Sequence, residues 1–107
     1  MKTTNGYVYL IADVFNETYK IGVTRRKVEQ RLKQLQTGNS NQLDLIDYYQ
    51  TEYPYKLESM LHNRFKPQQA NNEWYFLTKE DIDNFQDTCN HLNEIINVMK
   101  DSPFFWK

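Results

Sequence analysis

Two residues with metal-ligand chemistry, Glu58 and His62, lie four positions apart in the middle of the sequence. Leu57, Leu61 and Phe65 recur around them at helical spacing and predict an amphipathic helix. Side chains four positions apart lie on one face of a helix, so Glu58 and His62 can point at one place near a sheet edge. A carboxylate suits Mg²⁺, whose shell is usually completed by water and substrate phosphate. The pattern predicts either a metal site or an ordinary hydrogen-bonded Glu–His pair.

An arginine in an earlier helical segment is suited to bind phosphate. In residues 27–36, Val28, Leu32 and Leu35 form an apolar stripe, and Arg31 falls beside Leu35 at its border. The stem of such an arginine lies on the core while its guanidinium emerges beside the sheet, where it can hold a phosphate with two N–H groups. The alternative is an arginine that extends to the surface and pairs with an acid.

Two predicted strands near the start of the chain carry the next candidates. Residues 7–12 and 19–24 are rich in aromatic and β-branched side chains, and the polar segment between them suits a hairpin loop. Side chains alternate between the two faces of a strand, so Tyr9 and Lys20 can share one surface while Tyr19 points to the other.

The remaining segments complete an α+β fold of the order β-β-α-β-α-β-α. The expected elements are a third strand over Leu43–Tyr49, a helix from Pro54 to Pro67, a polar loop over Gln68–Asn72, an edge strand over Glu73–Leu77 and a long helix over 79–100. Thr78 and Asp81 resemble a capping box at the start of that last helix. We expect a single domain over residues 1–107, with a core over 6–78, a small, mainly antiparallel sheet flanked by helices, and an aromatic tail over 101–107.

The charge of the chain is unevenly distributed. The net charge is only −1, so the protein has no overall cationic field. Residues 1–37 nevertheless carry seven basic and three acidic side chains. This favours a basic face that contacts phosphates through Arg25, Arg26, Lys27 and Lys33, although a solvated charge run is the alternative.

Several kinds of chemistry are excluded. The single cysteine, Cys89, allows neither an internal disulfide nor a cysteine-rich zinc site, and its place in an apolar stripe gives it no nucleophilic role. His91 falls on the outer side of the same helix. No phosphate-binding glycine loop or Gly-x-Ser-x-Gly motif is present. Without a membrane-length apolar run or a signal peptide, we expect a soluble cytoplasmic protein.

The order of five short motifs resembles the GIY-YIG nuclease superfamily. They are Tyr7-Val8-Tyr9, Lys20-Ile21-Gly22, Arg31-Leu32, Leu57-Glu58 and Glu73-Trp74-Tyr75. The sequence is most similar to a small phage-type branch in which the second motif reads Lys-Ile-Gly. The resemblance covers residues 6 to about 78, with Tyr7 at the glycine position of the first motif and Lys20 replacing a tyrosine in the second.

This resemblance implies a site in which Tyr9, Arg31 and Glu58 gather on one face of a three-stranded sheet. Glu58 would hold one divalent metal, Mg²⁺ or Mn²⁺, and Arg31 would stabilise charge on the phosphoryl group. Tyr9 would orient or deprotonate the attacking water. Since tyrosine is a weak base at neutral pH, the nearby charge of Lys20 would assist it.

The function implied is a metal-dependent endonuclease that hydrolyses phosphodiester bonds, with DNA favoured over RNA. The alternative is a catalytically weak or inactive module of the same fold that binds nucleic acid or a protein partner. The tail Pro103-Phe104-Phe105-Trp106 is expected either to dock on the protein's own core or to mediate self-association or partner binding.

Overall fold

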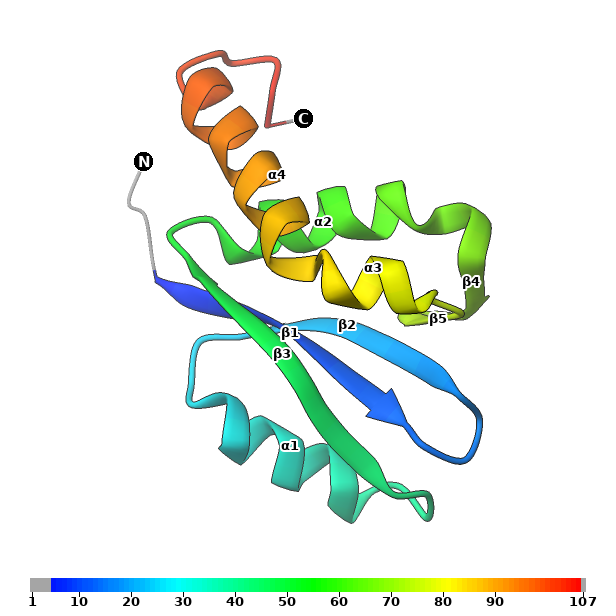
Figure 1. The fold of residues 1–107 in the computed structure, drawn as a ribbon. Helices are drawn as coiled ribbons and strands as arrows, with labels where there is room; N and C mark the ends of the chain where they lie inside the picture. The colour runs from blue at the N-terminus through cyan, green and yellow to red at the C-terminus, as the bar shows by residue number, and fades with distance from the viewer. Residues whose placement is uncertain (1–4, 107) are drawn as a thin grey trace.

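The computed structural model describes residues 5–106 and has one antiparallel sheet between two helical layers, which confirms the predicted α+β class (Figure 1). Residues 1–4 and Lys107, the last residue of the predicted tail, lie outside the described residues. None of the helices formed by the described residues combines the length and the apolar character of a membrane span.

The sheet has five strands in the order β3-β1-β2-β5-β4, and every neighbouring pair is antiparallel. The strands are β1 (Gly6–Asp13), β2 (Thr18–Thr24), β3 (Leu43–Thr51), β4 (Gln69–Asn71) and β5 (Trp74–Tyr75). In the register of β1 with β2, Tyr9 is opposite Gly22 and Ile11 is opposite Lys20. Directly opposed residues point to the same face, so Tyr9 and Lys20 share one face of the sheet.

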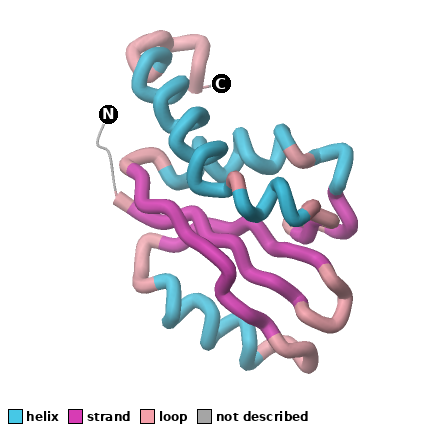
Figure 2. Tube along the Cα trace, viewed as in Figure 1, coloured by secondary structure: helices cyan, strands magenta, loops and turns pink. Residues whose placement is uncertain are grey.

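Two apolar cores lie on the two faces of this sheet. Helix α1 (Val28–Thr37) covers one face, and α2 (Pro54–Arg64), α3 (Lys79–Asp83) and α4 (Phe85–Met99) cover the other (Figure 2). The α1 core contains Tyr9, Ile11, Val28 and Leu43. The larger core, below α2 and α4, contains Val8, Leu10, Ile21, Leu57, Leu61, Tyr75, Phe85, Cys89 and Ile96 among its buried residues. Alternate residues of β1 and β2 therefore enter different cores.

Two predicted elements are wrong in detail. The expected loop over Gln68–Asn72 starts on the last residue of a short 3-10 turn, Lys66–Gln68, and then forms β4, because the polar chain turns back and pairs with β5. The expected edge strand over Glu73–Leu77 is limited to β5, and β4 forms the edge.

The expected continuous helix over 79–100 is interrupted between α3 and α4. The break is at Asn84, which has φ −95° and ψ 9°, outside the helical range. The capping box at the start of α3 is present, since Thr78 accepts from the backbone N–H of Asp81 and the Asp81 carboxylate accepts from that of Thr78.

The aromatic tail docks on the protein itself. Phe105 and Trp106 pack against the larger core, and the indole of Trp106 donates to the carbonyl of Lys100 at 2.8 Å. Lys56 of α2 donates to the Phe105 carbonyl at 2.9 Å. Of the two predicted roles for the tail, docking on its own chain is the one observed.

Asp13 joins the β1–β2 turn to the start of β3, and its removal is expected to destabilise the fold in a pH-dependent way. Its carboxylate accepts from the backbone N–H groups of Phe15 and Asn16 and from the amides of Asn16 and Asn41, at 2.9 to 3.2 Å. Burial alone would raise the pKa of Asp13, but these hydrogen bonds outweigh it and lower the pKa below its usual value.

The Asp13→Ala variant is expected to lose roughly 2 kcal/mol of unfolding free energy near neutral pH, as hydrogen bonds to a buried charged group are lost. The pKa of Asp13 is lower in the folded chain than in the unfolded chain. The carboxylate therefore adds to the free energy of unfolding at pH values above its pKa in the unfolded chain, and this stabilisation disappears as the pH falls through its pKa in the folded chain. Urea unfolding of the wild type and of Asp13→Ala, from neutral to acidic pH, measures the gap between their free energies of unfolding. Asp101→Ala, an exposed change, is the control, and a gap that widened on acidification would contradict the expectation.

Candidate metal and phosphate site

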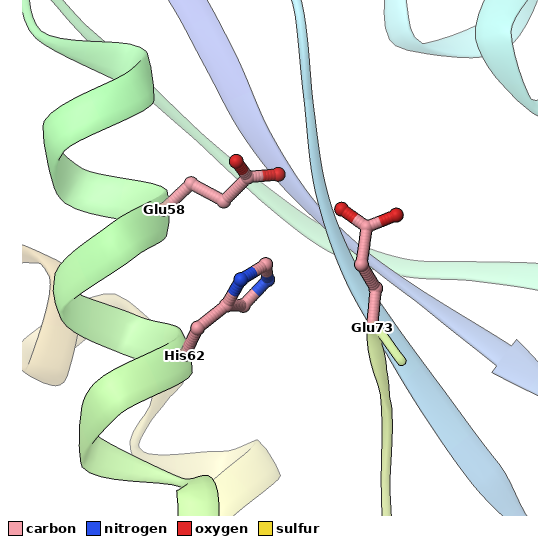
Figure 3. A group of neighbouring side chains, drawn as sticks. All are labelled: Glu58, His62 and Glu73. Carbon is pink, nitrogen blue, oxygen red and sulfur yellow. The ribbon is translucent and has the colours of Figure 1, made fainter. Parts of the chain in front are cut away.

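Two acidic residues and one histidine form a cluster that can hold a metal ion. One ligand atom each of Glu58, His62 and Glu73 lies within 4.8 Å of the other two, and all three side chains are half-buried. Glu58 and His62 project from α2 toward Glu73, which precedes β5 (Figure 3). The predicted helix pair therefore has a third potential ligand from another element.

A backbone contact fixes the ring of His62. Its Nε2 lies 2.8 Å from the carbonyl oxygen of Ile21 in β2. A carbonyl only accepts, so Nε2 carries the proton and, in the neutral ring, Nδ1 is left as a possible metal ligand. The ring also lies 5.6 Å from that of Tyr75. A histidine that donates its other N–H to a carbonyl is the usual arrangement of a metal-binding imidazole.

Lys20 lies at the same cluster. Its Nζ donates to Oε2 of Glu73 at 2.7 Å and stands 5.8 Å from the centre of the Trp74 ring. Tyr19 instead packs against the larger core on the other face. The alternation of β2 thus directs Lys20, and not Tyr19, to the cluster.

The two carboxyl groups of the cluster have opposite pKa shifts. Burial raises the pKa of Glu58, with His62 opposing this shift and Glu73 adding to it. Burial acts in the same direction on Glu73, but the hydrogen bond and charge of Lys20 outweigh it and lower its pKa. Glu58 is therefore the carboxyl that more readily keeps a proton, and it shares a hydrogen bond with Glu73. A cation entering the cluster would replace that proton.

Tyr9 and Arg31 form a second group on the α1 face of the sheet. The Nε of Arg31 donates to the Tyr9 hydroxyl at 3.4 Å, and its Nη1 donates to Oε1 of Gln34 at 3.3 Å. Both contacts are long for N–H···O hydrogen bonds, so a phosphate oxygen can replace them at little cost. Tyr9 is only 1% exposed, whereas Arg31 is half-buried, as its place at the border of the stripe predicts.

The two groups approach each other at the edge of β2. The Tyr9 ring lies directly over Gly22, and His62 contacts the carbonyl of Ile21, the preceding residue. Strand β5 pairs with β2 at Tyr19 and Lys20, and the backbone N–H of Ile21 donates to the carbonyl of Glu73 at 3.1 Å, so the edge of β2 beyond Ile21 is not covered by β5.

Glu58 does not lie on the same sheet face as Tyr9 and Arg31, contrary to the arrangement implied by the resemblance. Its helix packs on the opposite face, where Leu57 and Leu61 enter the larger core. Glu58 and His62 reach the edge of β2 from that face. The site is therefore built around a strand edge, from both sides of the sheet.

The basic residues predicted to contact nucleic acid are exposed but not all on one side. Arg25, Arg26 and Lys27 form the loop between β2 and α1, and Arg25 lies 5.2 Å from the ring centre of Tyr55 at the start of α2. Lys33 is exposed on α1, but two residues from Arg31 it projects from nearly the opposite side of the helix. The loop is thus better placed than Lys33 to assist the site.

Glu73 was not predicted as a site residue, although it begins the motif Glu73-Trp74-Tyr75. The sequence signal was a single acid directly before a strand that is otherwise aromatic and apolar. Glu73 reaches the site because β5 pairs with β2, and this pairing places Glu73 beside Lys20.

The donor set fits a small divalent cation. Octahedral Mg²⁺ has ligands at about 2.1 Å, so its protein ligand atoms lie within roughly 4.2 Å of one another, close to the spacing found here. Lys20 occupies Oε2 of Glu73, which leaves Oε1 for a metal. Two carboxylates with an imidazole also suit Mn²⁺.

Comparison with known families gives one match. The family model of the T5orf172 domain, a phage-associated domain, matches residues 6–90, which include the whole sheet and all the residues of both groups. No curated protein and no solved structure matches the chain.

Proposed function

This chain belongs to the T5orf172 domain family, and on that premise we propose that it is a divalent-metal-dependent endonuclease of the GIY-YIG type that cleaves DNA. The observation that supports this most is the convergence of a carboxylate–imidazole cluster and an arginine–tyrosine pair on the Ile21–Gly22 segment of β2. A phosphodiester lying across this segment would have potential metal ligands on one side and an arginine on the other.

The metal would be Mg²⁺ or Mn²⁺, held by Glu58, His62 and Glu73. When bound, such an ion acts as a Lewis acid on the phosphoryl oxygen and the leaving oxygen. His62 is held in one orientation by its bond to the Ile21 carbonyl, so the imidazole needs no rearrangement to act as a ligand.

Arg31 binds and stabilises the phosphoryl group in this proposal. Its guanidinium exchanges the long contacts to Tyr9 and Gln34 for two oxygens of the phosphate. The bound charge increases toward the transition state, so the arginine stabilises that state more than the substrate.

Tyr9 orients the attacking water once Arg31 has turned to the phosphate. Its hydroxyl is buried, with Arg31 against it. Lys20 is bound to Glu73, so its charge favours the ionised form of that carboxylate. Arg25, Arg26 and Lys27 hold the backbone of the nucleic acid, with Lys33 contributing at longer range.

A cleavage assay tests the proposal. Supercoiled, linear and single-stranded DNA are incubated with the wild-type chain and Mg²⁺ or Mn²⁺, and with the Arg31→Ala variant. We expect metal-dependent cleavage that falls about 10²- to 10³-fold in the variant, the usual cost of removing one group that stabilises the transition state.

Arg64→Ala is the matched control, since Arg64 is an exposed arginine at the end of α2 and no role in the site is assigned to it. Its cleavage rate should equal that of the wild type. Binding of DNA without cleavage of any substrate, with or without metal, would contradict the enzyme and favour the non-catalytic module of the same fold.

A further inference from the structure

A second hollow opens beside the proposed catalytic site and takes no part in the mechanism. It is lined by residues of the β1–β2 turn, the loop between α1 and β3, and the β4–β5 hairpin. Its volume is about 480 Å³, within the range of small-ligand sites and sufficient for a nucleotide. The lining contains four asparagines, Asn16, Asn39, Asn41 and Asn71, and two aromatic residues, Trp74 and Phe76.

Hydrogen bonds within the chain hold three of the four asparagines and leave other polar groups of their side chains available. Asn16 and Asn41 donate their Nδ2 groups to Asp13 at 2.9 and 3.2 Å, and their side-chain carbonyl oxygens remain as acceptors. The side-chain oxygen of Asn39, Oδ1, accepts from the backbone N–H of Asn41, which leaves the side-chain NH₂ of Asn39 as a donor. Among residues 5–106, no side-chain hydrogen bond involves the amide group of the Asn71 side chain. This mixture of donors and acceptors matches the polar edge of a nucleobase.

The aromatic residues supply a stacking surface next to these amides. Phe76 is 57% exposed and lines the hollow together with the half-buried Trp74. Trp74 joins the hollow to the catalytic site, because Lys20 stands over its ring and Glu73 precedes it in the chain. Every base has a flat aromatic face, so a Phe–Trp wall binds bases with little sequence preference.

Strand β2 connects the hollow to the site. Gly22, Lys20 and Thr18 point to the same face, and they lie respectively under Tyr9, beside Glu73 and in the wall of the hollow. At about 3.3 Å per residue, the distance along the strand from Gly22 to Thr18 is roughly 13 Å. A nucleic-acid strand bound at the site can therefore place a base in the hollow within a few nucleotides.

We propose that this hollow binds an unstacked nucleobase, so that the substrate is single-stranded, or is opened, next to the cleaved bond. In an intact duplex the base edges are paired and the faces are stacked, and neither is available to the asparagines or to Phe76. That this nucleic-acid strand runs from the hollow to the catalytic site rests on the proposed nuclease function. Binding of the base itself needs neither a metal nor turnover.

Tryptophan fluorescence in EDTA tests this inference. The chain has two tryptophans, so a Trp106→Phe background leaves Trp74 as the only reporter. A short single-stranded DNA should quench its fluorescence with an affinity at least about 10-fold higher than a blunt duplex of the same sequence. Phe76→Leu should weaken single-strand binding roughly 5- to 100-fold, the range for loss of one stacked base. Asn71→Ala should weaken it by a smaller factor.

Phe104→Leu is the matched control, because Phe104 is also an exposed phenylalanine but belongs to the tail, far from the hollow. Equal binding by the parent and the Phe76→Leu variant, or equal binding of duplex and single strand, would overturn the inference. A free mononucleotide that binds as tightly as the strand would contradict a strand site.

The two proposals fail separately. If the chain binds single strands through Phe76 but cleaves nothing with metal, the base site stands and the nuclease does not. If it cleaves DNA with metal while Phe76→Leu changes neither binding nor the preference for single strands, only the base site is wrong.

Discussion

Replacing Glu58 with glutamine is expected to lower the cleavage rate about 10³-fold or more, which is a loss of roughly 4 kcal/mol of transition-state stabilisation. Glutamine keeps the size of the side chain and one oxygen, but not the negative charge that attracts a divalent cation. Glu58 is half-buried between His62 and Glu73, so no other described side chain offers its place in the cluster.

The same variant should lose the stabilisation that a metal gives to the folded chain. A ligand that binds only the native state at about 100 times its Kd adds roughly 2.7 kcal/mol, on the order of 10 °C in Tm for a domain of this size. Thermal unfolding with EDTA and with Mn²⁺ measures this difference. The wild type should show the increase, and Glu58→Gln should show little of it.

In EDTA the variant should be at least as stable as the wild type, and this separates loss of a ligand from loss of the fold. The pKa of Glu58 is raised by burial, so its contribution to stability is full at low pH and is lost as pH rises through the folded value. A neutral amide avoids that loss. Glu52→Gln, the same change at an exposed position before α2, should leave cleavage and the Mn²⁺ effect intact. A Glu58→Gln protein that still gained stability with Mn²⁺ would show that this cluster is not the metal site.

Local patterns in the sequence predict the faces of the elements well, and the reason is geometric. The alternation of strands places Tyr9 and Lys20 on one face, and the register of β1 with β2 agrees with it. The border position of Arg31 predicts its half-burial, and the four-residue spacing predicts that Glu58 and His62 point the same way. Each of these depends only on the period of one element.

What depends on pairing between distant segments was not predictable in the same way. Glu73 joins the cluster because β5 pairs with the first half of β2, which requires the polar segment over 68–72 to turn back as β4. Nothing in the local pattern of either segment indicates this pairing. The break at Asn84 is also invisible to periodicity, since the apolar stripe continues in step from α3 to α4.

The side of the sheet from which Glu58 approaches the site was not predictable from local pattern either. A helix can lie on either face of a sheet, and its apolar stripe does not say which. Here α2 packs opposite α1, and Glu58 reaches the edge of β2 that β5 leaves uncovered. The site therefore depends on the shortness of β5 as much as on the residues themselves.

Gly22→Ala is expected to disrupt the site without removing any of its functional groups. A Cβ at this position would lie 2.7 Å from Cε1 of Tyr9, and its Cζ and hydroxyl would be closer still. The ring cannot move away freely, because Tyr9 is 1% exposed and packs in the α1 core. Glycine is thus required here by the close approach of the ring and not by an unusual backbone angle.

The displaced ring takes the Tyr9 hydroxyl and its Arg31 partner out of position, and misplacement by about 1 Å commonly lowers a rate by 10²-fold. Crowding in the core should also cost roughly 1–3 kcal/mol of unfolding free energy. Cleavage kinetics and urea unfolding measure the two effects. Gly38→Ala is the control, since its nearest neighbour, the Leu35 carbonyl oxygen, is 3.9 Å from an added Cβ. Because the proposed metal ligands Glu58, His62 and Glu73 come from α2 and from the residue before β5, and Tyr9 comes from β1, the variant should keep its Mn²⁺-induced rise in Tm while its cleavage rate falls. If Gly22→Ala cleaved DNA at the wild-type rate, Tyr9 and Arg31 would have no part in catalysis.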